Sequence, residues 1–73
     1  MTKENALADA QRIANLTGMK MAVANDPISN NPEDEPDGPW GFCPSCARFT
    51  SGPQKGNLML YPWAKEIILI QPS

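Results

Sequence analysis

Hydrophobic residues recur at helical spacing near the start of the chain. Between residues 3 and 17 they come in steps of three and four, at Ala6, Leu7, Ala10, Ile13 and Ala14. This spacing places them on one side of a helix, with polar residues opposite. Thr2 can cap the first turn, and Gly18 can end the helix in a left-handed conformation. The pattern therefore predicts an amphipathic helix over about 3–17 that packs on a sheet.

Later stretches have the patterns of strands. Residues 19–24 alternate, with Met19, Met21 and Val23 on one side, which is the period of a half-buried strand. Strand-like stretches at 58–61 and 66–71, the second with an apolar run at 67–70, flank a turn and predict an antiparallel hairpin over about 58–71. Residues 67–70 are apolar on both faces, so this strand is either central in the sheet or in contact with another molecule.

The segment between these strands is polar. Residues 25–39 hold four prolines and five acids, and Ile28 is their only large apolar side chain. So little apolar surface cannot offset the entropy of ordering, which predicts a long, mobile acidic loop. Trp40 and Phe42 follow in an extended piece that would point both side chains to one face, into the core.

These elements predict one fold class. Residues 1–73 are expected to form a single small domain. Its architecture is α+β, with one N-terminal helix packed on an antiparallel sheet of three or four strands.

The charge is unevenly distributed. The net charge is −2, but residues 21–47 contain no Lys or Arg. Carboxylates in this stretch can meet a basic partner, and aromatic side chains at the predicted hairpin turn can act as anchors. The candidate partner-binding residues are Glu33, Asp34, Glu35, Asp37, Tyr61 and Trp63.

The basic residues are scattered and do not interleave with aromatic ones, so sequence-specific nucleic-acid binding is not expected. The chain starts with a charged helix pattern rather than a signal peptide, and its apolar runs are too short to span a bilayer. We therefore expect a cytoplasmic protein with no membrane partner.

The motif Cys43-Pro44-Ser45-Cys46 is the one piece of the chain with evident chemistry. It resembles half of a zinc knuckle and the apex of a zinc hook, which implies Cys43 and Cys46 as metal ligands. Histidine is absent and the chain has no second cysteine pair. Zinc would thus need carboxylates of the acidic loop or a second copy of the chain. The motif also resembles the Cys-Pro-x-Cys of glutaredoxins, which implies thiol exchange. The third interpretation is that both cysteines only pack in the core.

No motif for nucleophilic or acid–base catalysis is visible, so we expect a protein that is not an enzyme and has no cofactor. In size and layout the chain resembles the small accessory proteins of bacteriophages and mobile elements, including anti-CRISPR proteins. That resemblance implies an inhibitor that binds a host protein or complex in a bacterial or phage-infected cell. The alternative is a small zinc-binding module that uses the Cys-Pro-Ser-Cys pair, with a dimer as one form of it. The apolar C-terminal strand offers a route to a homodimer.

Overall fold

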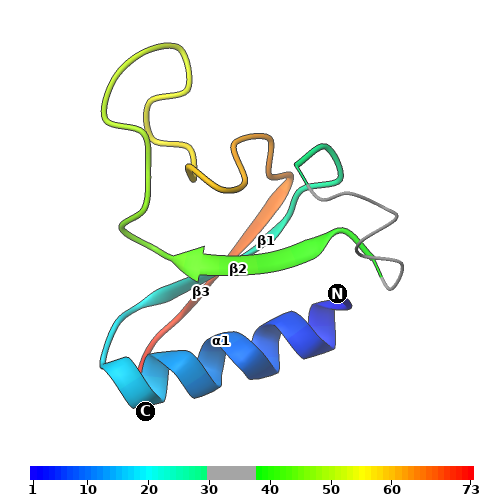
Figure 1. Ribbon diagram of the computed structural model, residues 1–73, viewed down its shortest axis with the longest axis vertical. Coiled ribbons are helices and arrows are strands. Elements are labelled where there is room, and N and C mark those ends of the chain that lie inside the picture. The colour runs from blue at the N-terminus through cyan, green and yellow to red at the C-terminus, as the bar shows by residue number, and fades with distance from the viewer. Residues whose placement is uncertain (30–37) are drawn as a thin grey trace.

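One helix packs on an antiparallel sheet. The computed structural model describes residues 1–29 and 38–73. In chain order these form α1 (Lys3–Thr17), β1 (Met21–Asn25), β2 (Trp40–Pro44) and β3 (Glu66–Ile70). The described strands make a three-stranded sheet in the order β2-β1-β3 (Figure 1). The predicted α+β class is confirmed, with the helix lying on the sheet.

Helix α1 has the bounds expected from its pattern. The Thr2 hydroxyl oxygen accepts a hydrogen bond of 3.1 Å from the backbone N–H of Asn5. Gly18 ends the helix at φ 73°, and its N–H donates to the carbonyl of Ala14. Helix positions with small side chains face the sheet and are fully buried, namely Ala6, Ala10 and Ala14. Because alanine is small, the helix axis can lie close to the strands.

Strand β1 is the centre of the sheet. It pairs antiparallel with β2 on one side and with β3 on the other, so Met21 lies opposite both Pro44 and Ile70. The first four residues of β1 are fully or almost fully buried. The strand begins two residues later than the sequence predicted. Met19 and Lys20 are exposed and form the connection after the Gly18 cap.

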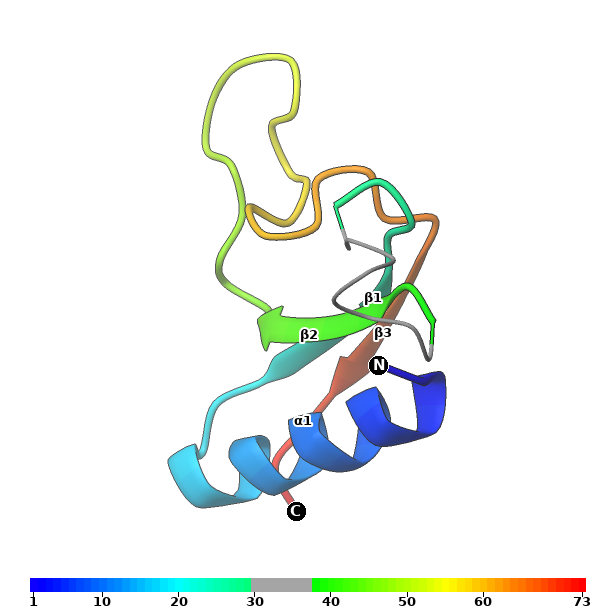
Figure 2. The same cartoon turned by 45° about the vertical axis from the view of Figure 1, so that its right-hand side comes forward.

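Each face of the sheet has its own hydrophobic cluster. The first cluster lies between the sheet and α1, where Met21 and Val23 meet the helix alanines, and Trp40 and Phe42 pack beside them. The predicted shared orientation of Trp40 and Phe42 is therefore confirmed. The second cluster lies on the opposite face and contains Ala22, Ala24, Cys43, Leu58, Tyr61 and Ala64. Helix, sheet and the 45–65 segment thus form successive layers (Figure 2).

The predicted hairpin over about 58–71 is wrong. Only its second half is a strand, and β3 pairs with β1 instead. Residues 45–65 cross the outer face of the sheet in turns, with a single isolated bridge between Arg48 and Leu58. Leu58 is fully buried in the second cluster while Met59 and Leu60 are exposed, so this apolar run covers the sheet rather than extending it. Nor is β3 central, since β1 holds that position.

Candidate functional site

A buried carboxylate follows directly after the central strand. Asp26 is completely buried, and no other charged side chain among the described residues is. Its Oδ1 accepts hydrogen bonds from the backbone N–H groups of Ile28 (3.0 Å) and Ser29 (2.8 Å). Its Oδ2 accepts from the backbone N–H of Trp63 at 2.9 Å. One side chain therefore ties the turn after β1 to the loop that precedes β3.

These hydrogen bonds determine the ionisation of Asp26. Burial by itself raises the pKa of this carboxyl, because it disfavours the charged form. Hydrogen bonds from Ser29, Trp63 and Ile28 favour the carboxylate, and together they outweigh burial, so the pKa lies below its ordinary value. At neutral pH Asp26 is thus an ionised carboxylate, and both of its oxygens accept hydrogen bonds that join the two segments.

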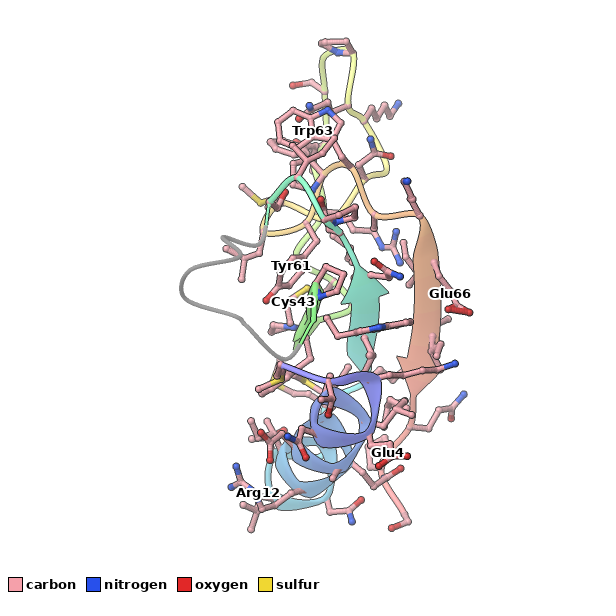
Figure 3. All side chains as sticks on the ribbon, turned by 90° about the vertical axis from the view of Figure 1, so that its right-hand side faces the viewer. Glu4, Arg12, Cys43, Tyr61, Trp63 and Glu66 are labelled. Carbon is pink, nitrogen blue, oxygen red and sulfur yellow. The ribbon has the colours of Figure 1, made fainter. Side chains whose placement is uncertain are left out.

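The junction brings two exposed apolar residues together. Ile28 is 66% exposed and Trp63 is 51% exposed. Because their backbone N–H groups bind the same carboxylate, the two residues leave the fold at one corner, which we call the Ile28–Trp63 corner. Figure 3 shows Trp63 at the end of the molecule away from α1. Two large apolar side chains on a fixed backbone are typical of a binding surface.

The predicted partner-binding residues have different outcomes. Trp63 is exposed, as expected of an anchor. Tyr61 is only partly exposed: its ring packs over Gly41 in the second cluster, and its hydroxyl donates to the carbonyl of Phe42 at 3.5 Å. Tyr61 thus has a packing role, and its part in partner binding stays a prediction. The acidic candidates, namely Glu33, Asp34, Glu35 and Asp37, lie outside the described residues.

The two cysteines are in different surroundings. Cys43 is buried in β2 and belongs to the second cluster, whereas Cys46 is exposed in the following turn, and neither forms a disulfide. Burial raises the pKa of the Cys43 thiol, and the neighbouring Cys46 adds to this, while Arg48 opposes it. Thiol exchange and zinc binding both use the thiolate, which a raised pKa disfavours. The packing interpretation therefore fits Cys43 but not Cys46.

The zinc prediction depends on ligands beyond this pair. Among residues 1–29 and 38–73, no group of three or more His, Cys, Asp or Glu side chains could hold a metal ion. The sequence-based hypothesis drew its further ligands from the acidic loop or from a second copy. Neither is within the described structure, so zinc binding stays a prediction.

No protein-family model matches this sequence, and no curated protein or solved structure matches it either. Within the described part of the chain, no helix is long and apolar enough to cross a membrane.

The sequence-based reasoning missed Asp26 as an organising residue. In the sequence, Asp26 is one of the five acids of residues 25–39, and Ile28 is the only large apolar side chain among them. A local signal was present, because an aspartate just after a strand and followed by proline readily accepts hydrogen bonds from N–H groups two and three residues later. The contact with Trp63 has no such signal, since it joins distant parts of the chain.

Proposed function

We propose that this chain is a small, non-catalytic protein that acts by binding another protein, and that the Ile28–Trp63 corner is part of its binding surface. The observation that supports this proposal most directly is the pair of exposed apolar side chains on backbones held by one buried carboxylate. An anchor whose backbone is already ordered loses little entropy on binding. Tryptophan is also among the residues that contribute most to protein interfaces.

The acidic residues extend this proposal to the partner. Ser29, the last residue described before the acidic stretch, is itself bound to Asp26. Glu33, Asp34, Glu35 and Asp37 therefore follow the corner closely in the chain, and they supply carboxylates to a partner with a basic surface. We propose a host protein or protein complex in the bacterial cytoplasm, with inhibition of a defence complex, as in anti-CRISPR proteins, as the specific form.

An affinity purification from a bacterial lysate tests the proposal, with the captured proteins identified by mass spectrometry. Trp63→Ala is expected to lower the affinity for the captured partner by about tenfold or more, as for an interface hot spot. Leu16→Ala is the matched control, because Leu16 is also an exposed large apolar residue but lies at the end of α1. Equal capture by the wild type and Trp63→Ala would exclude the corner as the binding surface.

A second set of variants tests the contribution of the acidic residues to binding separately from that of Trp63. Lysine substitutions at Glu33, Asp34, Glu35 and Asp37 are expected to abolish binding and to leave the thermal unfolding transition in place. If these variants bind as the wild type does, the acidic residues only connect β1 to β2.

A further inference from the structure

The two outer edges of the sheet differ. The edge of β2 is covered: the backbone N–H of Trp40 donates to the carbonyl of Met1 at 3.3 Å, and the terminal ammonium of Met1 lies 3.4 Å from the carbonyl of Trp40. The Tyr61 hydroxyl reaches the carbonyl of Phe42 on the same strand. In the described residues, β3 has β1 as its one strand neighbour, and nothing else bonds to its backbone. Within residues 1–29 and 38–73, the outer edge of β3 therefore has no backbone partner.

The side chains of β3 after Glu66, its first residue, do not protect this edge. Natural edge strands commonly carry a charge, a proline or a bulge that prevents pairing with another strand. Ile67, Ile68, Leu69 and Ile70 have none of these. On the face away from α1, Ile67 is 40% and Leu69 is 61% exposed. Figure 3 shows Glu66, at the start of the strand, pointing away from the body of the molecule.

Strand β3 is also anchored by hydrogen bonds at both ends. Before it, the N–H of Lys65 donates to the carbonyl of Asn25 at 2.7 Å. After it, the carbonyl of Gln71 accepts from Nε2 of Gln11 at 2.8 Å, and Ser73 binds Oδ1 of Asn15. A strand that is already ordered can add a neighbour without further loss of backbone entropy.

We propose that β3 pairs antiparallel with β3 of a second copy of this chain, which joins the two sheets into one. This pairing goes beyond the proposed binding function, and it uses an edge that does not include the Ile28–Trp63 corner. A twofold arrangement uses the same residues of both copies, so the edge must tolerate contact with itself. With Ile68 on the axis, Ile67 of one copy lies opposite Leu69 of the other on the same face of the sheet.

The charges beside the strand agree with this register. The same pairing puts Glu66 opposite Ile70, and Lys65 opposite Gln71, so no two like charges face each other. The exposed side chains of Ile67 and Leu69 from both copies then form one apolar group across the junction. A second copy thus offers an edge strand of matching length, in which the one charged side chain, Glu66, lies opposite Ile70 and not opposite another charge.

Sedimentation of the purified chain over a concentration series tests the pairing. The wild type is expected to approach twice the monomer mass of 8.0 kDa. Leu69→Lys is expected to sediment as a monomer, because it places lysines at the junction. Leu60→Lys is the matched control: Leu60 has the same 61% exposure as Leu69 but lies in the 45–65 segment, and this variant is expected to dimerise as the wild type does.

Amide hydrogen exchange adds a readout at the strand itself. The outward-facing amides of β3 are expected to be protected in concentrated wild type and to lose protection on dilution, and in Leu69→Lys to be unprotected at every concentration. Near-UV circular dichroism shows whether each variant is folded. A wild type that stays monomeric throughout the series, or a dimer that Leu69→Lys retains, would overturn the proposal. Both results are independent of whether a host partner binds at Trp63.

Discussion

The ring of Tyr61 lies over Gly41, in the space that the Cβ atom of any other residue would fill. Gly41 is the second residue of β2, and Tyr61 belongs to the segment that covers the outer face of the sheet. The contact explains why a strand residue here has no side chain. It also sets how closely the segment around Tyr61 approaches the sheet.

Substitution of Gly41 by alanine is expected to destabilise the fold. The new methyl group would overlap the Tyr61 ring, and overpacking of this kind costs about 1–3 kcal/mol. Chemical denaturation of Gly41→Ala against the wild type measures the loss in the free energy of unfolding.

The double variant Gly41→Ala/Tyr61→Ala identifies the cause. If the ring is responsible, the two substitutions together should cost less than the sum of their separate effects. Strictly additive costs would show that the methyl group is unfavourable for another reason.

The junction at Asp26 predicts a dependence of stability on pH. Its pKa is lower in the folded chain than the ordinary value of about 3.8, so the carboxylate stabilises the fold above that value. This contribution decreases as pH falls below about 3.8 and is gone once pH has passed the folded pKa. Asp26→Asn lacks it, because an amide offers one acceptor oxygen to three N–H donors. We expect a cost of about 1–3 kcal/mol at pH 7.

Urea unfolding of both proteins at neutral and acidic pH checks this prediction. The difference in stability between wild type and Asp26→Asn should shrink as the pH is lowered. Asp9→Asn, which removes the same charge from α1, is the control for net charge. A difference that stays constant with pH would contradict the assigned role of the carboxylate.

The buried alanines of α1 predict a limit on the size of the side chains that fit between the helix and the sheet. Ala10 is fully buried against the sheet, whereas Ala8 is exposed. Ala10→Leu is expected to push the helix from β1 and lower stability by about 1–3 kcal/mol. Ala8→Leu adds the same atoms on the solvent side and should have little effect on the thermal transition. Equal effects of the two substitutions would argue against close helix–sheet packing.

The two thiols are expected to react at different rates. An alkylating reagent at neutral pH should modify Cys46 first, because Cys46 is exposed, whereas Cys43 is buried and its pKa is raised. Mass spectrometry of partly alkylated protein locates the label. Rapid labelling of Cys43 in the folded chain would contradict its place in the second cluster.

A chelator separates the binding-protein proposal from the zinc alternative. If Cys43 acts as a core residue, the melting temperature should be the same with and without chelator. Bound zinc in native mass spectrometry, together with a lower melting temperature in chelator, would favour the zinc-binding module.

The helix could be predicted from local pattern alone. Its cap at Thr2, its buried alanines and its stop at Gly18 each depend on contacts between residues only a few positions apart in the chain. Strand β1 and the orientation of Trp40 and Phe42 were also visible as alternation, although β1 is buried on both faces and not half-buried as predicted. These features depend on neighbouring residues, which is the information that a sequence pattern contains.

The pairing of strands could not be predicted in the same way. Residues 58–61 have the apolar composition of a strand. Leu58 is instead buried against the outer face of the sheet, and the backbone around it continues in turns. Composition does not distinguish an apolar segment that extends a sheet from one that covers it. The junction of Asp26 with Trp63 was missed for the same reason, since it is a contact between distant segments.

The central position of β1 has a consequence for how the chain folds. Met21 pairs with Ile70, so nearly the whole middle of the chain must close into a loop before the sheet is complete. Closing a long loop has an entropic cost that slows folding. Until β3 docks, the second edge of β1 has no partner strand, and Met21 and Val23 lack their neighbours on that side. We therefore expect an early state made of α1, β1 and β2 in which the second edge of β1 can pair with other chains, and docking of β3 as the step that covers this edge.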